Sequence, residues 1–544
     1  MENREDLISI LPCLPLKLES SHLAWPNPVI EALKSLSKGP SHSRVDSGEV
    51  LFLAISDLRN SLSLSPHLLA PSTADGYALF FDEFLTRAEA AKWFGEVIPV
   101  MAELLLRFPT LLESHYQYAD IIMVGVDTGL RLLKPQQPGI VLLSQELIAA
   151  LIACSFFCLF PTANRGANHL PVINFDRLFA MLYENYHENQ EHKIKCIVHY
   201  FERIHSCIPT GFVSFERKVL PLDHNSPLVS YPTAGFWANS IVPLCLFEIC
   251  PSGLIEDQSR GALEVDFANK YLGGGALSKG CVQEEIRFMI NPELIAGILF
   301  LPSMSDNEAI EIVGAERFSN YSGYASTFRY AGNHVDLREV DSLGRRTTKI
   351  VAVDALSRPG LRQYRVDYLL REVNKAFCGF LDQPKDQQFQ IPLQCSSSRE
   401  VQPGSDPMDV NNSESQAKDC GIFPDTDGSK ATQSMDFKLQ MCHSDVGIAT
   451  GNWGCGAFGG DPQVKTVIQW LAASQALRPF VLYYTFEMEA LRNLDQVRSW
   501  IMSHNWTVGD LWNMLADYSY RRAKGETKLG FFSWLLPSFY LTGE

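Results

Sequence analysis

Apolar residues recur at three- and four-residue intervals through roughly the first 215 residues of the chain. Segments 92–112 (KWFGEVIPVMAELLLRFPTLL) and 175–186 (FDRLFAMLYENY) have this period, which predicts amphipathic helices. The most apolar run, 147–160 (LIAALIACSFFCLF), has fourteen residues, fewer than the roughly 20 that a membrane-spanning helix needs. We therefore predict a buried core helix there, no membrane partner, and a helical accessory region over residues 1–220.

After about residue 220 the pattern changes to short β-rich runs that alternate with helices. Segments 262–269 (ALEVDFAN), 309–316 (AIEIVGAE) and 348–356 (TKIVAVDAL) predict strands because they are enriched in Val, Ile and Phe. Segment 368–381 (YLLREVNKAFCGFL) predicts a helix. This alternation is typical of an α/β domain in which helices flank a sheet.

Residues 383–445 interrupt the α/β pattern. They are rich in Gln, Ser, Asp, Asn and Pro and have almost no apolar periodicity, a composition that predicts a disordered surface insertion. A regulatory or partner-binding segment is the alternative. The insertion would divide one α/β domain into a first part, 221–382, and a second part with the C-terminal tail, 446–544.

A glycine-rich loop follows a short predicted strand in segment 447–475 (GIATGNWGCGAFGGDPQVKTVIQWLAASQ). Asp461 and Pro462 match the N-cap and the first position of a helix. The loop should therefore end at a helix amino terminus, where free N–H groups favour a phosphate or diphosphate. Residues 454–459 also fit GxGxxG, but Glu487 lies beyond the spacing of a ribose-binding acid, so this match is weak. A tight turn without a ligand is the alternative.

The stretch 271–288 (YLGGGALSKGCVQEEIRF) places three consecutive glycines shortly before Gln-Glu-Glu. The glycines predict a loop shaped around a ligand, and a carboxylate drawn out of water can acquire the raised pKa that acid–base chemistry needs. Neighbouring side chains point in different directions, so Glu284 and Glu285 cannot be two equivalent catalytic acids. A solvated acidic turn is the alternative.

Asp266 and Asn269 fall at the end of a predicted strand, just before the triple glycine. Side chains at strand ends commonly meet ligands in α/β folds. Asp and Asn also commonly satisfy the backbone groups of turns. Their spacing in the sequence does not separate these two interpretations.

The overall charge and the cysteines narrow the function classes. The chain has 46 basic and 62 acidic residues, a formal net charge of −16, which argues against duplex nucleic-acid binding and leaves small anionic ligands open. The 13 cysteines lack zinc-ligand spacing, so we expect free thiols in a reducing compartment and no metal site. The amino terminus lacks the features of a signal peptide, so secretion is not expected.

Five motifs occur together in a recognisable order: VDFANKYLGGG, QEEIRFMINPEL, YSGYAS, VAVDAL and GNWGCGAFGGD. With them the chain resembles the poly(ADP-ribose) glycohydrolase family over about residues 220–382 and 446–500, and its helical N-terminal portion is similar to that of plant members. The resemblance implies an α/β fold with a macro-domain-like mixed sheet flanked by helices. It also implies hydrolysis of the ribose–ribose bonds of poly(ADP-ribose), with no cofactor and no metal.

The resemblance further implies roles for individual residues. Glu285 would be the acid/base, and Glu284 and Asp266 would support the position of the sugar. Tyr324 and Phe486, which could otherwise be ordinary core aromatics, would pack near the adenine and its ribose. The implied substrate contacts are Glu256 at the adenine edge; Asn269, Gly273, Gly274 and Gly275 around the ribose; Gly454, Cys455, Gly456, Ala457, Phe458, Gly459 and Gly460 around the diphosphate; and Gln283, Asn452, Tyr324 and Phe486.

Two other functions compete with this interpretation. A non-catalytic ADP-ribose reader would keep the fold, but it has no need of the glutamate pair; a dinucleotide-dependent oxidoreductase is a more distant third. The partners implied by the resemblance are poly(ADP-ribose) and ADP-ribosylated proteins, with no sequence-specific nucleic acid and a monomeric state. Residence in the nucleus or cytoplasm follows mainly from the family, because the basic runs GRRTTK and YRRAKGETK are too short or too broken for a polybasic signal.

Overall fold

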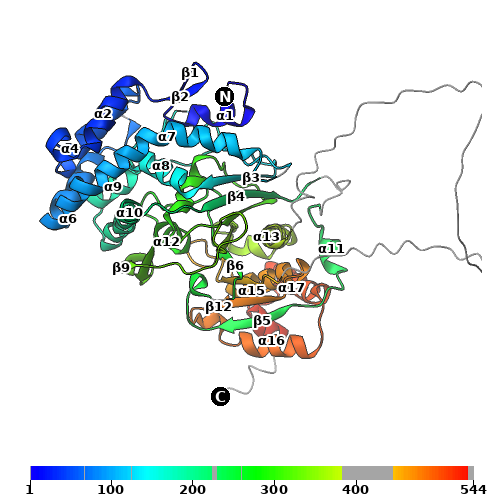
Figure 1. The fold of residues 1–544 in the computed structure, drawn as a ribbon. Coiled ribbons are helices and arrows are strands. Elements are labelled where there is room, and N and C mark those ends of the chain that lie inside the picture. Colours follow the sequence, from blue (N-terminus) through cyan, green and yellow to red (C-terminus); the bar gives the residue numbers. More distant parts are fainter. Residues whose placement is uncertain are drawn as a thin grey trace, which may run out of the picture. The chain divides into compact units, whose positions relative to one another are not determined.

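An eight-stranded mixed sheet organises the fold (Figure 1). The computed structural model describes residues 2–65, 68–123, 125–163, 165–222, 230–258, 260–382 and 445–536. All but the last residue of the predicted insertion, 383–445, lies outside these ranges. The strands in their order across the sheet are β3 (Gly139–Ser144), β4 (Phe212–Val219), β7 (Glu308–Val313), β10 (Lys349–Ala352), β6 (Leu263–Asp266), β11 (Ile448–Gly451), β12 (Phe480–Tyr484) and β5 (Leu246–Cys250).

One half of this sheet is antiparallel and the other half is parallel. Strands β3, β4, β7 and β10 pair antiparallel, whereas β10, β6, β11, β12 and β5 run parallel to one another. The carboxyl ends of the five parallel strands therefore meet at one edge of the sheet. In open α/β sheets that edge is the usual place of a ligand site.

Successive side chains of a strand face opposite sides of the sheet, and here both sides are buried. Ile310, Ile312 and Ile350 belong to a core shared with the N-terminal helices. Ala309 and Val351, one position away, belong to a second core shared with the C-terminal helices. A sheet covered on both faces explains why its strands are almost continuously apolar.

The first face is covered by helices from the N-terminal half, drawn in blue and cyan beside β3 and β4 in Figure 1. A two-stranded hairpin, β1 (Lys17–Glu19) and β2 (His22–Ala24), lies among them. The helices are α1 (Glu5–Ile10), α2 (Asn27–Ser37), α3 (Pro40–Ser43), α4 (Gly48–Ser61), α5 (Thr73–Ala78), α6 (Arg87–Lys92), α7 (Ile98–Ala119), α8 (Gln145–Phe156), α9 (Asp176–Glu184) and α10 (Glu188–Ser206), with π-helical turns at Leu79–Phe84 and Trp93–Val97 and a 3₁₀ turn at Leu11–Cys13.

The second face is covered mainly by α13, α15 and α17. A second hairpin, β8 (Ser319–Ser322) and β9 (Arg329–Asn333), packs against α10. The helices of the C-terminal part of the chain are α11 (Ala234–Ala238), α12 (Gln283–Ile290), α13 (Val366–Phe380), α15 (Pro462–Gln475), α16 (Leu494–Ser503), α17 (Val508–Lys524) and α18 (Phe531–Leu535), with 3₁₀ turns at Ile255–Asp257, Pro292–Leu299, Ala325–Thr327, Gly360–Tyr364 and Glu489–Leu491.

Most elements lie where the sequence predicts them. The apolar run at 147–160 is largely α8, whose residues are all buried, and none of the helices in the described ranges is long and apolar enough to cross a membrane. The α/β class with a mixed sheet is confirmed. One difference is that residues before 220, expected to be an accessory helical region, also supply β3 and β4 of the main sheet. The pairing of these strands with β7 is long-range, and local periodicity does not report it.

The crossing of α5 and α9 provides a test of this packing. A Cβ on Gly76 would overlap the main-chain carbonyl of Phe179, next to the stacked rings of Tyr77 and Phe179. We expect Gly76→Ala to lower the free energy of unfolding by about 1–3 kcal/mol, because overpacking forces a backbone shift. Gly95→Ala is the matched control, since its Cβ meets no atom within 4 Å; equal unfolding midpoints for both variants would contradict the prediction.

Candidate active site

A cavity of about 500 Å³ opens at the carboxyl edge of the parallel strands. Several residues singled out in the sequence line it: Glu256, Gln283, Tyr324, Asn452, Gly454, Gly456, Ala457, Phe458 and Phe486. The glutamate pair directly follows Gln283 on the first turn of α12. The structure therefore brings the QEE motif, the YSGYAS motif and the second glycine loop to one place.

Both oxygens of Glu285 accept hydrogen bonds from the main chain. The Gly275 N–H donates to Oε1 at 2.8 Å, and the Val282 N–H donates to Oε2 at 2.9 Å. Val282 is the N-cap of α12 and Glu285 its third residue, so the carboxylate closes back onto the start of its own helix as in a capping box. This double anchor fixes the direction of the Glu285 side chain.

Glu284 is anchored in the same way on its own side of the helix. The Asn269 N–H donates to Oε2 at 2.9 Å and the Gly273 N–H donates to Oε1 at 2.7 Å. The two adjacent carboxylates thus use four main-chain donors from segment 269–282. The first turn of α12 favours negative charge as well, because its N–H groups carry partial positive charge.

The glycines are required by the closeness of these carboxylates. Gly274 has φ +48°, and a Cβ on it would lie 2.5 Å from Oε2 of Glu284 and 2.8 Å from Oε1 of Glu285. A Cβ on Gly280 would lie 2.7 Å from Cδ of Glu285. We call residues 273–282 the triple-glycine loop. A side chain at Gly274 or Gly280 would displace a carboxylate.

Asp266 ends β6 beneath the triple-glycine loop. Asp266 is 1 % exposed. Among the described residues, neither of its carboxylate oxygens accepts a hydrogen bond. Burial raises the pKa of Asp266 to about 7; the guanidinium of Arg287 lowers it, and the charge of Glu285 raises it further. Burial, Asp266 and Glu285 also raise the pKa of Glu284, against its main-chain donors. Glu284 already accepts two N–H bonds, whereas Asp266 accepts none among the described residues. Protonation is therefore accommodated better at Asp266 than at Glu284.

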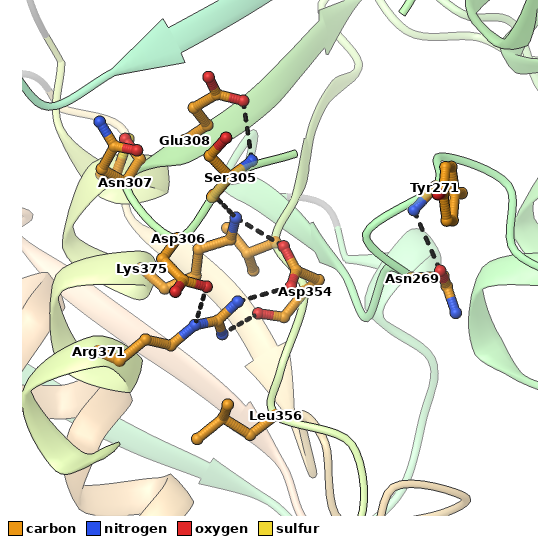
Figure 2. A network of polar contacts seen from close by, with 12 residues as sticks. Asn269, Tyr271, Ser305, Asp306, Asn307, Glu308, Asp354, Leu356, Arg371 and Lys375 are labelled. Carbon is orange, nitrogen blue, oxygen red and sulfur yellow. Dashed lines mark hydrogen bonds and ion pairs between the residues drawn. The ribbon is translucent and has the colours of Figure 1, made fainter. Parts of the chain in front are cut away.

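Asn269 closes the turn that follows β6. Its Oδ1 accepts a hydrogen bond from the Tyr271 N–H at 3.0 Å (Figure 2). This oxygen of Asn269 therefore satisfies a backbone group of the turn, one of the two interpretations that the sequence left open. No such bond is found for Asp266 within the described residues, so the two residues behave differently.

The cavity is also lined by the residues expected near adenine. Oε1 of Glu256 accepts a hydrogen bond from the hydroxyl of Tyr321 at 2.6 Å, and its main-chain oxygen accepts from Arg338. Tyr324 and Phe486 are 54 % and 47 % exposed, so they are not core aromatics. Phe486 has φ +49°, a left-handed conformation that is unusual for a bulky residue. Tyr321 was missed as a site residue, although it is the first Tyr of YSGYAS.

The second glycine loop joins β11 to α15. Asp461 caps the helix, since its Oδ1 accepts from Gln463 N–H at 2.9 Å, and Pro462 is the first helical residue, as predicted. Inside the loop, the N–H groups of Cys455, Gly459 and Gly460 donate to loop carbonyls. We therefore expect main-chain contacts to a phosphate from the cavity-lining segment 456–458, and not from Cys455 or Gly459.

A buried ionic network fixes the neighbouring strand-end segment 353–356 (Figure 2). Arg371 of α13 pairs with Asp354 at 2.6 Å, with Asp306 at 2.8 Å and with Glu372 at 2.7 Å. Lys375 pairs with Asp354 at 2.6 Å. Although burial opposes it, the charges of Lys375 and Arg371 hold the pKa of Asp354 below its usual value.

This network supports the second glycine loop directly. Oε1 of Glu372 accepts from the Leu356 N–H, and Glu372 also pairs with Lys465 of α15. The Lys465 ammonium lies 4.0 Å from the ring centroid of Trp453, whose indole N–H donates to the main-chain oxygen of Val353 at 2.9 Å. Two loops that come from different strand ends are thereby held against each other.

Asp266 predicts a measurable pH dependence. An acid whose pKa is raised in the folded state binds more protons folded than unfolded, so its contribution to stability is present at low pH and is lost as the pH rises from about 4 to 7. We expect Asp266→Asn, relative to the natural protein, to gain up to about 1.4 kcal/mol of unfolding free energy per pH unit over this window.

The measurement is denaturant unfolding of both proteins at several pH values between 4 and 8. Asp517→Asn is the control, because Asp517 forms only a surface pair with Arg521. Parallel stability curves for Asp266→Asn and the natural protein would show that Asp266 is not protonated in the folded state.

Comparisons with known proteins give one consistent family. The family model described as poly(ADP-ribose) glycohydrolase, helical domain, matches residues 85–217, and the one described as poly(ADP-ribose) glycohydrolase, macro domain fold, matches residues 234–493. The chain is 58 % identical to poly(ADP-ribose) glycohydrolase 1 of Arabidopsis thaliana over 100 % of this chain and 99 % of that protein. It is 52 % identical to a probable poly(ADP-ribose) glycohydrolase 2 of the same plant over 99 % of both chains.

A more distant relative supports the same assignment. Poly(ADP-ribose) glycohydrolase 1 of Caenorhabditis elegans is 30 % identical over 69 % of this chain and 39 % of its own length. The two family models together match both the helical region and the α/β region that carries the glutamate pair. The chain belongs to the poly(ADP-ribose) glycohydrolase family and is similar over its whole length to the plant proteins of that family.

Proposed function

We propose that this protein hydrolyses the ribose–ribose O-glycosidic bonds of poly(ADP-ribose) and releases ADP-ribose, with Glu285 as the acid/base. Full-length similarity to plant proteins named as poly(ADP-ribose) glycohydrolases supports the reaction. The observation that carries the assignment of Glu285 is its carboxylate, held by two main-chain N–H groups beside the strand-end cavity.

The chemistry uses one carboxyl group in two steps. Glu285 first donates a proton to the departing ribose oxygen while positive charge develops on the anomeric carbon; its carboxylate then takes a proton from the attacking water. Each carboxylate oxygen has a second lone pair besides the one that accepts the main-chain N–H. The two anchors can therefore persist while Glu285 exchanges protons with substrate and water.

The neighbouring acids have different tasks. Glu284 uses both oxygens to hold the main chain at Asn269 and Gly273, which supports a role in shaping the ribose site. Asp266 is buried and its pKa is raised to about 7, which supports a carboxyl group that is protonated in a large fraction of the molecules at neutral pH. A third charged carboxylate next to Glu284 and Glu285 would otherwise add repulsion in a water-poor site.

The rest of the cavity supports recognition of one ADP-ribose unit. Glu256 and the exposed rings of Tyr324 and Phe486 are placed for the adenosine, and segment 456–458 for the diphosphate. A net charge of −16 favours short-range contacts to individual units over capture of a polyanion along a basic groove. We further propose that the protein acts as a monomer, in the nucleus or the cytoplasm, on poly(ADP-ribose) and ADP-ribosylated proteins.

A Glu285→Gln variant tests the reaction and its acid/base together. We expect ADP-ribose release from poly(ADP-ribose) to fall about 10²–10⁴-fold, the range lost with a general acid/base, while ADP-ribose affinity measured by calorimetry changes less than threefold. Glu489→Gln, on the exposed surface pair with Arg492, is the control. Binding without release by the natural protein would instead support a non-catalytic reader, and equal release by the natural protein and Glu285→Gln would exclude Glu285 from the chemistry.

Gly280→Ala tests the position of the carboxylate without changing its chemistry. Gly280 does not have a positive φ, so the substitution adds no backbone strain of that kind. Its Cβ would lie 2.7 Å from Cδ of Glu285 and 2.8 Å from Cα of Gly275, whose N–H anchors the same carboxylate. We expect kcat to fall about 100-fold, as a displacement near 1 Å of a reacting group can cause. Gly95→Ala is again the control, and an unchanged kcat in Gly280→Ala would show that the position of Glu285 tolerates this change.

A further inference from the structure

One face of α10, in the N-terminal helical region, lies against the triple-glycine loop. Lys193 donates two hydrogen bonds to main-chain carbonyls of this loop, at Ser278 and Gly280, both at 2.6 Å. One turn earlier, the side-chain amide of Gln190 donates to the Lys279 carbonyl at 3.2 Å. Three consecutive loop carbonyls, 278–280, are thus bound from a single helix.

The same helix face also contacts a second segment next to the cavity. Asn189 donates from Nδ2 to the Ala325 carbonyl at 3.0 Å, in the turn that directly follows Tyr324. Positions 190 and 193 are three residues apart and positions 189 and 193 four apart, so both Asn189 and Gln190 neighbour Lys193 on one side of the helix. Two cavity segments that are distant in sequence therefore rest on one rigid element.

Lys193 is an unusual residue to find at this contact. Its residue is 0 % exposed, and burying an ammonium group is costly unless it is well paired. Burial lowers the pKa of Lys193 to about 8, while the neighbouring Cys281, Glu285 and Cys196 raise it. A long cationic side chain is thus buried close to Glu285. Burying an apolar side chain at the same position would carry a smaller desolvation penalty.

Two glycines, Gly280 and Gly275, link Lys193 to Glu285. The carbonyl of Gly280 binds Lys193, its N–H donates to the Gly275 carbonyl at 3.0 Å, and its Cα faces the Glu285 carboxylate. Gly275 in turn donates its own N–H to Oε1 of Glu285. A shift of the 278–280 carbonyls would therefore move both the glycine that touches the carboxylate and a donor that anchors it.

We propose that Lys193 is a positioning residue for Glu285, so that the helical region completes the active site by holding the triple-glycine loop from behind. This inference rests on the proposed function. Lys193 does not line the cavity, and the residues placed for adenine and diphosphate lie on other segments. Because the implied ribose contacts at Gly273–Gly275 belong to the same loop, ADP-ribose binding should weaken slightly, whereas the step that depends on Glu285 should slow much more.

The test is Lys193→Met, which keeps an unbranched side chain and removes the donor. We expect kcat for ADP-ribose release to fall at least tenfold, with KM and the affinity for ADP-ribose within threefold of the natural protein. The matched control is Lys195→Met on the same helix, where the lysine forms only an i,i+4 pair with Glu191. It should leave kcat unchanged.

Each outcome decides the inference. If the natural protein releases ADP-ribose and Lys193→Met has the same kcat, the role of Lys193 is refuted but the proposed function is not. If the natural protein releases no ADP-ribose, the proposed function itself is refuted. Parallel loss of kcat and ADP-ribose affinity would indicate a general structural role and overturn the inference. If Lys193→Met does not fold, Gln190→Ala decides: a three- to tenfold loss of kcat with unchanged ADP-ribose affinity supports loop positioning, and an unchanged kcat overturns it.

Discussion

The arrangement of the site depends on four main-chain N–H groups that bind two adjacent carboxylates. Glu284 and Glu285 leave the first turn of α12 about 100° apart, so one segment must pass close to both in order to reach all four oxygens. It does so between Asn269 and Val282, and only glycine leaves enough room for that approach. The flexible residues next to the charges are therefore a requirement of the bonding, and the donors offset the mutual repulsion of the pair.

The sheet and its helices provide the rigidity that a glycine-rich segment lacks. Parallel β6, β10 and β11 bring three chain segments to one edge, and the pairs of Arg371 and Lys375 with Asp354 hold the segment after β10. Because a buried ionic network contributes little net stability compared with apolar packing, its value here is directional. Each charged partner fixes a particular strand end at a particular distance, as a purely apolar contact would not.

The sequence predicted the local features well and the long-range ones poorly. Asp461 and Pro462 identify the start of α15 because a helix cap is a property of neighbouring residues. The triple-glycine and QEE motifs locate the candidate site in the same way, whereas the substrate contacts of individual residues remain predictions from family resemblance. Lys193 lies 85 residues before Ser278. Its spacing from Ile197, Tyr200 and Phe201 places it on the apolar face of α10, but that spacing does not say which segment it meets there. Contacts of that kind depend on tertiary packing, which periodicity does not encode.

An acidic protein that acts on a polyanion needs favourable electrostatics over short distances. The buried cations near the second glycine loop do not supply a net field, since Arg371, Lys375 and Lys465 are matched by the carboxylates of Asp306, Asp354 and Glu372. Arg287, which lines the cavity, is likewise paired with Glu264. We therefore expect oriented main-chain N–H groups to supply the attraction, which acts only at hydrogen-bond range. A site built this way distinguishes a correctly seated diphosphate from phosphate in general. The same short-range bonding holds Glu285, whose carboxylate is contacted directly by the main-chain N–H groups of Gly275 and Val282.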